Sequence, residues 1–325
     1  MNPFAPTASQ RTAGSLLALA LGDAMGAPYE GGWAERALWR LLGTTRDGLR
    51  RTTDDTQMSR DLAQSLLACQ GLQADDAAQR FARSYRWHRG YGPGAAKVLK
   101  HIAAGMPWQQ ARLQVYAQGS WGNGGAMRAP VVALWVQSQL PGDCALSVAL
   151  AREQAAITHA HPLAQDGAAL IAAAVHSAWD LHLPALQPAA WLRQVVRDAA
   201  LVQTDTWQPR IDQALAWLQC THPTPTPAEV AAALGHGISA LDSCVTALYV
   251  AARFLRQDFA SLVDFVQRMG GDTDTIAAMA GSIYGAAQGE QALPPRWLAA
   301  LEDCAELRQL ARELAPAPAW LAGAA

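Results

Sequence analysis

The stretch Leu170-Ile-Ala-Ala-Ala-Val175 decides the fold class, because Leu170, Ile171, Ala174 and Val175 share one face of a helix. The same helical spacing recurs along the chain, at Leu62, Leu66 and Leu67 and at Ala247, Leu248, Ala251 and Phe254. Ala and Leu are far commoner than runs of β-branched residues, and no alternating strand with a hairpin turn is visible. The sequence therefore predicts an all-α protein with closely packed helices.

Segments rich in Gly and Pro separate these helical stretches without dividing the chain into unlike parts. They lie at residues 90–94, 122–125, 184–188 and 221–227. In the last of them, Thr226 and Pro227 suit the N-cap and the first position of the next helix. Apolar residues recur at helical spacing on both sides of each break. We therefore expect a compact single-domain orthogonal helical bundle over residues 11–314, with residues 1–10 and 315–325 as tails.

The composition excludes several classes of protein. Hydrophobic residues make up 51% of the 325 residues and charged residues only 16%, where about 25% is usual. Such a chain can bury a sizeable core, so it is not disordered as a whole. A net charge of −2 argues against a nucleic-acid binder, which would carry a basic face. The longest apolar runs, residues 16–21 and 129–136, are well short of the ~18 residues that a membrane span needs.

The N-terminus and the cysteines indicate a reducing compartment. Residues 1–10 lack the basic-then-apolar order of a signal peptide. The cysteines are odd in number, scattered and without CxxC spacing, so we expect small buried hydrophobic side chains rather than disulfides or a zinc ribbon: Cys69, Cys144, Cys220, Cys244 and Cys304. We therefore expect a cytoplasmic protein that binds neither nucleic acid nor a membrane.

Two acidic clusters stand out against this low charge. Thr53-Asp-Asp-Thr56 opens a helix that runs to about Cys69, and Gly270-Gly-Asp-Thr-Asp-Thr275 opens a helix from Ile276 to Ala287. Either cluster alone could be a helix cap, since Asp and Thr are favoured there. One cap needs one side chain, however, and neighbouring carboxylates repel each other unless a cation neutralises them. Oxygen ligands without Cys or His suit Mg²⁺ or Mn²⁺, and two such turns facing each other could hold two ions.

A glycine-rich loop and a histidine pair are further candidates. The loop Gly122-Asn-Gly-Gly125 precedes a helix over residues 127–136. Its glycines would let backbone N–H groups approach an anion such as a diphosphate, although a simple turn is the alternative. His159 and His161 stand just before Pro162 begins a helix. Their spacing could chelate zinc, but no third soft ligand lies nearby.

Five motifs in series make the sequence resemble the ADP-ribosylglycohydrolase family, which includes the dinitrogenase reductase-activating glycohydrolase and ADP-ribosylarginine hydrolases. The motifs are Gly22-Asp-Ala-Met-Gly-Ala-Pro-Tyr-Glu30, Thr53-Asp-Asp-Thr-Gln-Met58, Gly122-Asn-Gly-Gly-Ala-Met-Arg128, Thr158-His-Ala-His-Pro162 and Gly270-Gly-Asp-Thr-Asp-Thr-Ile276. The resemblance covers about residues 11–290. It implies an all-α fold, a centre of two Mg²⁺ or Mn²⁺ ions, and an active-site cleft formed by helix N-termini and loops.

Matching the motifs residue by residue implies roles for single side chains. The implied metal ligands are Thr53, Asp54, Asp55, Asp272, Asp274 and Thr275. The implied contacts to phosphate and ribose are Gly122, Asn123, Gly124, Gly125 and His159. Glu30 and Asp55 are the implied catalytic residues, Glu30 as general base with a water held by the metals as the alternative. Without the resemblance, Glu30 would be interpreted as a solvated loop acid.

Other positions in or near the motifs are interpreted as supporting residues or as part of the wall around the site. We expect Asp23, at a helix end, to support the site from behind, and Arg128 to be a buried structural cation paired with an acid. His161 is either a cap or a core residue. The segments 90–94 and 235–237 resemble the variable substrate side of the family. Thr52 stands where many relatives carry an aromatic residue, so the shape of that wall departs from the family pattern.

The resemblance implies hydrolysis of the glycosidic bond between ADP-ribose and a modified side chain, with arginine as the first acceptor. An oxygen-linked serine or acetyl adduct is the alternative, and a protein that only binds ADP-ribose is a third. No position matching a metal ligand is lost, which disfavours the third. The expected partners are an ADP-ribosylated protein or a small molecule that contains ADP-ribose, and we expect a monomer.

Overall fold

The computed structural model describes residues 5–220 and 224–315. The ends of both expected tails, residues 1–4 and 316–325, lie outside the described residues, as do residues 221–223 of the Pro-rich segment. Within the described ranges the chain is helical with no named strand, which confirms the all-α prediction. The first helix begins at Ala8, inside the segment expected to be a tail.

Long helices alternate with short 3₁₀ turns along the chain. The α-helices are α1 (Ala8–Gly26), α2 (Trp33–Leu42), α3 (Asp54–Cys69), α4 (Ala74–Ser84), α5 (Pro93–Ala103), α6 (Trp108–Val115), α7 (Ala129–Gln139), α8 (Cys144–Ala156), α9 (Pro162–Ala178), α10 (Pro188–Ala199), α11 (Thr204–Gln219), α12 (Pro227–Leu234), α13 (Ala240–Phe254), α14 (Phe259–Met269), α15 (Thr273–Gln288), α16 (Pro295–Ala300) and α17 (Cys304–Leu314). The 3₁₀ turns are η1 (Ala27–Tyr29), η2 (Trp87–Arg89), η3 (Asn123–Gly125), η4 (Leu183–Ala185) and η5 (Glu290–Ala292).

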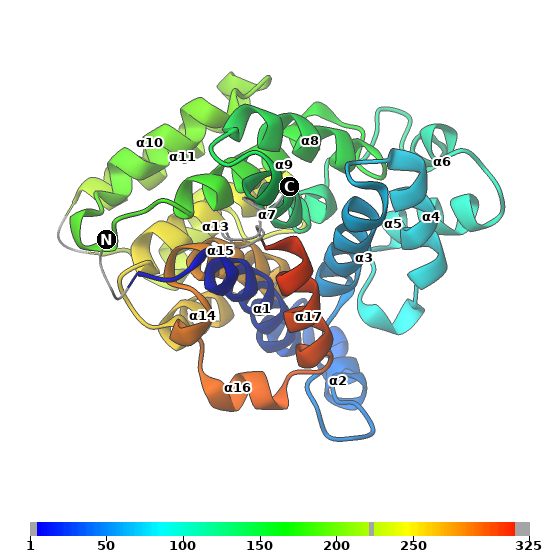
Figure 1. Cartoon of the computed structure of the whole chain (residues 1–325), viewed down its shortest axis with the longest axis horizontal. Coiled ribbons are helices and arrows are strands. Elements are labelled where there is room, and N and C mark those ends of the chain that lie inside the picture. The colour runs from blue at the N-terminus through cyan, green and yellow to red at the C-terminus, as the bar shows by residue number, and fades with distance from the viewer. Residues whose placement is uncertain (1–4, 221–223, 316–325) are drawn as a thin grey trace, which may run out of the picture.

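Helices α1 and α15 form the centre of the molecule, side by side along most of their lengths (Figure 1). Their backbones touch because both helices present glycine where they meet. A Cβ atom on Gly22 would lie 2.2 Å from the carbonyl oxygen of Ala277, and one on Gly285 would lie 2.0 Å from that of Gly14. Small residues thus let α15, buried from Thr273 to Ala287, occupy the core without bulky side chains between the two helices.

The remaining helices pack around this pair in one continuous core. Helices α7, α8, α9 and α13 cover one side, and α10 and α11 pack outside them. Helices α3 to α6 lie together at the right of Figure 1, opposite α10 and α11. This arrangement confirms a single compact bundle. The expected cap at Thr226 is confirmed too, since its hydroxyl accepts a hydrogen bond from the backbone N–H of Glu229.

A short pairing of extended segments ties the last part of the described chain to the turn before α3. The backbone N–H of Arg50 donates to the carbonyl of Ala300 at 2.7 Å, and that of Glu302 donates to the carbonyl of Arg50 at 3.0 Å. The buried Glu302 carboxylate accepts from the backbone N–H of Thr52 at 2.5 Å and is paired with Arg89. Thr52 is therefore held by Glu302 directly before the first acidic turn.

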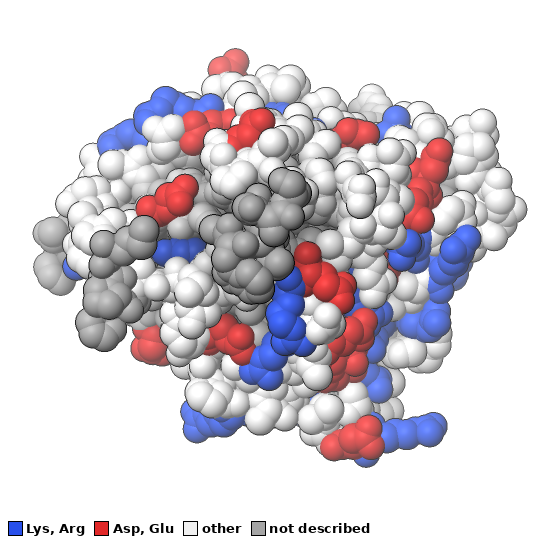
Figure 2. Space-filling model, in the orientation of Figure 1, with Lys and Arg blue, Asp and Glu red and all other residues white. Residues whose placement is uncertain are grey.

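Charged side chains of both signs are interspersed over the face drawn in Figure 2, in keeping with the small net charge. None of the helices in the described part of the chain is long and apolar enough to cross a membrane.

Candidate active site

The first acidic turn is capped by a residue from another helix. Asp23, fully buried near the end of α1, accepts from the backbone N–H of Thr53 at 2.9 Å and of Thr56 at 3.1 Å. It also accepts from the hydroxyl of Thr56 at 2.5 Å. Asp23 thus satisfies free N–H groups at the beginning of α3. The side chain of Thr53 accepts from another, the backbone N–H of Asp55. The carboxylates of Asp54 and Asp55 are not used as caps, so capping does not explain them.

The second acidic turn lies at the start of α15, which begins three residues earlier than the sequence suggests. Asp274 and Thr275 therefore stand in its first turn, and Asp272 is at the N-cap position without a capping bond from its side chain. The turn is fixed by two backbone contacts: the Thr273 hydroxyl donates to the carbonyl of Gly26 at 2.9 Å, and the N–H of Asp272 donates to the carbonyl of His236 at 2.8 Å.

Gly271 is required for this approach. Its φ is +78°, and a Cβ atom there would lie 2.0 Å from the carbonyl oxygen of His236.

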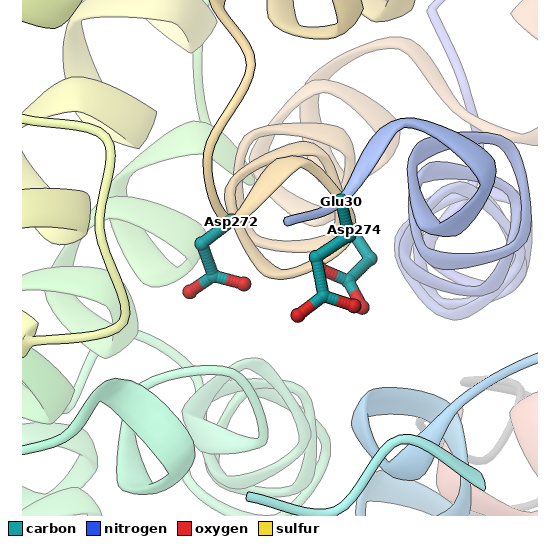
Figure 3. A group of neighbouring side chains, drawn as sticks. All are labelled: Glu30, Asp272 and Asp274. Carbon is teal, nitrogen blue, oxygen red and sulfur yellow. The ribbon is translucent and has the colours of Figure 1, made fainter. Parts of the chain in front are cut away.

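The two turns meet although they are far apart in the sequence. The hydroxyl of Thr275 donates to Oδ2 of Asp55 at 3.2 Å across 220 positions of the chain. The N–H of Gly31 donates to the carbonyl of Gly271 at 3.2 Å and so places the preceding Glu30 beside α15. Figure 3 shows the carboxylates of Glu30, Asp272 and Asp274 projecting to the same side, and each offers an oxygen within 4.8 Å of the others.

The electrostatics of this cluster call for a cation. Burial and neighbouring carboxylates raise the pKa of Asp54 to about 8, and burial and Glu30 raise the pKa of Asp272 to about 6. The pKa values of Asp55 and Asp274 are raised well above the usual range for the same reasons. Oδ1 of Asp55 and Oδ1 of Asp274 are buried and have no hydrogen-bond donor in the described part of the chain.

Hard divalent ions fit this donor set. Its ligand atoms are carboxylate and hydroxyl oxygens, and two of the carboxylate oxygens are left without a proton donor. Mg²⁺ and Mn²⁺ prefer such oxygens, and their charge would relieve the repulsion that raises these pKa values.

A cavity of about 180 Å³ opens over the cluster. Most residues expected at the site line it: Glu30, Asp54, Asp55, Gly122, Asn123, Gly124, His159, Asp272, Asp274 and Thr275. Thr53 and Gly125 are not among the lining residues. The hydroxyl of Thr53 donates to Oδ2 of Asp55 at 3.1 Å, and a Cβ atom on Gly125 would lie 2.5 Å from Cβ of Ala155 on α8.

Asn123 holds a carboxylate as well as lining the cavity. Its side-chain nitrogen donates to Oδ2 of Asp272 at 2.6 Å and lies 3.1 Å from the hydroxyl of Ser243. Its backbone N–H donates to the carbonyl of Ile238 at 3.0 Å. Asn123 therefore fixes Asp272, a role that the sequence motif does not reveal.

His159 is a neutral hydrogen-bond donor facing the cavity. Burial and the nearby Arg128 lower its pKa to about 3, so the ring is uncharged at neutral pH. The hydroxyl of Thr158 accepts from Arg128 at 2.9 Å, so its own hydrogen is available to Nδ1 of His159 at 2.7 Å. The ring proton then resides on Nε2, which lies against Gly122 and Gly124.

Arg128 is buried as expected, but its expected pairing with an acid is wrong. The guanidinium donates to Gln154, to the carbonyl of Gly124 and to Thr158. Through these neutral acceptors Arg128 holds the glycine loop, and it acts on an acid through its charge alone, which lowers the pKa of Asp54. His161 caps α9 by accepting from the backbone N–H of Leu163 at 3.2 Å, which decides between its two interpretations.

Six further cavity residues escaped the sequence interpretation: Met58, Ala95, Tyr116, Ser120, Met127 and Ile238. Met58 and Met127 stand inside quoted motifs and could have been found there. The segment 90–94 lines the cavity through Gly90, Gly92, Pro93 and Gly94. The segment 235–237 does not line it, but the next residue, Ile238, does.

Known proteins are similar to this chain over nearly all of its length. A sequence profile of the family described as ADP-ribosylglycohydrolase matches residues 5–321. ADP-ribosylhydrolase ARH3 of Danio rerio is 34% identical, with 94% of this chain and 90% of the relative covered, and the Homo sapiens protein of that name is 35% identical, with 84% and 80% covered. ADP-ribosyl-[dinitrogen reductase] glycohydrolase of Rhodospirillum rubrum is 27% identical, with 95% and 96% covered. A solved structure named ADP-ribosylglycohydrolase-related protein complex superposes with a TM-score of 0.67 at 27% identity, with 94% of this chain and 97% of that chain covered.

Proposed function

The chain belongs to the ADP-ribosylglycohydrolase family and is a hydrolase of ADP-ribose adducts, and from this premise we propose that the cavity over the two acidic turns cleaves ADP-ribose from a modified side chain with the help of two divalent ions. The observation that carries the proposal is the meeting of Asp54 and Asp55 with Asp272 and Asp274 around one cavity that also contains Glu30. Carboxylates in such number, with raised pKa values, are typical of a site built for cations.

The ions would be held by Thr53, Asp54 and Asp55 from the turn of α3 and by Asp272, Asp274 and Thr275 from the turn of α15. When bound, they would supply positive charge that neutralises the carboxylates and stabilises oxygen atoms of the ribose. Asn123 keeps Asp272 in place through the 2.6 Å hydrogen bond, and Thr275 keeps Asp55 in place through the 3.2 Å bond. The ligands are therefore oriented before substrate arrives.

Glu30 would activate the attacking water. Its carboxylate stands at the rim of the cluster, within 4.8 Å of Asp272 and Asp274. The glycosidic bond breaks as the water oxygen bonds to the anomeric carbon, and the water proton passes to Glu30 and then to the departing acceptor. Nε2–H of His159 and the backbone of Gly122 and Gly124 would bind the phosphate and ribose oxygens of the ADP-ribose group.

For the acceptor we propose an oxygen-linked side chain such as serine in first place and arginine in second. His88 lines a second cavity that adjoins Glu30, and burial together with Arg51, Arg86 and Arg89 lowers the pKa of His88. A modified arginine would bring its cationic guanidinium close to these arginines, with Glu30 as the acid in the same cavity, whereas a serine side chain has no charge to desolvate.

Hydrolysis of ADP-ribosylated serine and arginine peptides in Mg²⁺ or Mn²⁺ tests the proposal. We expect free ADP-ribose to be released, fastest from serine, and release to be lost in Asp272→Asn. Asp205→Asn, an exposed aspartate on α11, is the matched control and should keep full activity. Full activity of metal-stripped Asp272→Asn would contradict the two-metal site. Tight binding of the peptides without any product would identify a binding protein instead.

A further inference from the structure

A second cavity adjoins the first and shares two lining residues with it. It measures about 190 Å³ and is lined by Ala27, Glu30, Leu38, Trp39, Leu42, Trp87, His88 and Gly90. Two of these residues, Glu30 and Gly90, also line the cavity over the acidic turns. Gly90 lies against the first turn, because a Cβ atom there would be 3.6 Å from Oδ1 of Asp54. The two cavities therefore meet beside Glu30 and Asp54.

The second cavity lies on the acceptor side of this meeting point. Tyr116, Ser120 and Ile238 line the first cavity and not the second. The first cavity also contains Asn123, His159 and the glycine loop, which suit the nucleotide. An adduct cleaved beside Glu30 has its ADP-ribose on that side, so the group that leaves with the acceptor must extend to the other.

Apart from Glu30 and His88, the residues that line the second cavity are apolar or glycine, and they come from separate elements. Leu38, Trp39 and Leu42 lie on one face of α2, which stands at the lower edge of Figure 1. Trp87 comes from η2 and packs edge-on against His88, with ring centroids 5.6 Å apart. Trp87 is 70% exposed and Leu38 is 52% exposed, so both offer apolar surface that a bound group would cover.

Charges of both signs surround the cavity. Arg51, Arg86 and Arg89 lie near its η2 side and lower the pKa of His88, but Arg89 is paired with Glu302, and Glu30 itself lines the cavity. Contact with the two tryptophans favours a neutral aromatic or aliphatic group, because a lysine or arginine side chain would have to lose water from its charge to enter.

We propose that this second cavity is an acceptor subsite, which binds an aromatic or aliphatic side chain next to the modified residue of an ADP-ribosylated polypeptide. The proposal rests on the proposed function, since only a hydrolase of protein adducts needs such a subsite. Trp39, Trp87 and Leu38 then determine which adducts are cleaved fastest, through contact with the polypeptide rather than with ADP-ribose.

The test compares three ADP-ribosylated peptides that differ only in the residue after the modified one: Phe, Ala or Arg. Each is made with serine and with arginine as the modified residue, and kcat/KM for ADP-ribose release is measured. We expect the Phe peptide to exceed the Ala peptide about ten-fold, as partial burial of one aromatic ring predicts, and the Arg peptide to be the slowest. In Trp87→Ala and in Trp39→Ala the Phe-to-Ala ratio should fall toward one. Trp33→Ala, an 85% exposed tryptophan on α2 outside the subsite, is the control and should keep the ratio.

Equal kcat/KM for the Phe and Ala peptides with the wild-type protein would overturn the subsite, as would a ratio that survives in Trp87→Ala. The proposed function would still stand, because ADP-ribose is released in both cases. If no peptide releases ADP-ribose, the proposed function is contradicted and the subsite with it. Circular dichroism of each variant shows whether a lost ratio reflects a lost fold; Trp87 is exposed enough that its replacement should leave the fold intact.

Discussion

Asp23 and the aspartates of the two acidic turns differ in what surrounds each carboxylate. Asp23 is saturated by three hydrogen bonds from Thr53 and Thr56. Asp55 and Asp274 each keep a buried oxygen that no donor among residues 5–220 and 224–315 reaches. Burial raises the pKa of Asp23 to about 6 despite its hydrogen bonds, which lower it. Its environment is complete within the protein, whereas that of Asp55 and Asp274 would be completed by the proposed cation.

Replacing Glu30 by Gln should slow release of ADP-ribose without weakening its binding. The amide cannot accept a proton from water, and loss of a general base typically lowers the rate by about 10²–10⁴-fold. The check is a single-turnover rate for hydrolysis together with calorimetric binding of ADP-ribose. Glu153→Gln, an exposed glutamate on α8, is the matched control. An unchanged rate would remove Glu30 from the mechanism.

Asp61 gives the protein a pH dependence of stability that is separate from the metal cluster. It is 4% exposed and accepts from the hydroxyl of Ser84, and burial raises its pKa to about 6 from 3.8. The folded state therefore binds more protons than the unfolded state between about pH 4 and pH 6, so the free energy of unfolding falls as the pH rises through that window.

Asp61→Asn should remove this fall, which amounts to something on the order of 3 kcal/mol. The measurement is urea unfolding of both proteins at a series of pH values from 4 to 7. Subtracting the two curves cancels the titration of the acidic turns. A constant difference across this range would contradict the assignment to Asp61.

The residue types in a motif predict the chemistry of a site better than they predict which residues hydrogen-bond to one another. The acidic residues could be found because four carboxylates in two short turns are hard to explain as caps. The hydrogen bond from Asn123 to Asp272 spans 149 positions, and that from Arg128 to Gln154 spans 26, so neither follows from local sequence. Tyr116 and Ile238 reach the cavity from loops, where no periodicity points to them.

At the scale of helices, the position of the second acidic turn depends on how closely α1 and α15 pack. The backbones touch at Gly14, Gly22 and Gly285, and the hydroxyls of Ser15 and Ser282 lie 2.8 Å apart in the same interface. Asp23 stands on α1 and Asp274 on α15, so any separation of the two helices moves a capping residue relative to a ligand.

Gly285→Ala should destabilise the protein and weaken the metal site together. The new Cβ atom would lie 2.0 Å from a backbone oxygen, which cannot move without shifting α1. We expect a loss of about 1–3 kcal/mol in the free energy of unfolding, as for an overpacked core, and weaker Mn²⁺ binding. Gly92→Ala is the control, because a Cβ atom there meets nothing within 4 Å. Equal stability of the two variants would show that the helices can separate freely.

Helical periodicity predicted the elements well where they are long and apolar. The helix α3 ends at Cys69 and α9 begins at Pro162, as expected. The start of α15 was misplaced because Thr273-Asp-Thr275 has poor helix propensity and polar side chains. Contacts with Gly26 and His236, which no local pattern reveals, hold these residues in the helix.

Over the whole molecule, bound metal would link α3 to α15 and so connect the early and late parts of the chain. Within the described residues the turns are joined directly by the single hydrogen bond from Thr275 to Asp55. Ions held by ligands from both turns would add a much stronger link, and binding to the folded state alone stabilises it in proportion to the logarithm of the ion concentration.

Removing divalent ions with a chelator should therefore lower the melting temperature. An ion at 100 times its dissociation constant adds about 2.7 kcal/mol of stability. The effect should grow from pH 5 to pH 8, because Asp272, with a pKa of about 6, and Asp54, with a pKa of about 8, must lose protons before they bind a cation. Differential scanning calorimetry with and without Mn²⁺ measures it. Asp272→Asn should lose most of the increment, and an undiminished increment would place the ions elsewhere.

The separation of the two acidic turns also decides when the site can form during protein synthesis. Once Asp55 has left the ribosome, 220 further residues must follow before Thr275 can reach it. At roughly 5–20 residues per second, this delay is on the order of 10–40 s. During that time the emerging chain carries half of a binding site, with no partner turn to complete it. If the turns bind divalent ions as proposed, only a nearly finished polypeptide can capture them, and a prematurely terminated chain would carry the first set of ligands without acquiring activity.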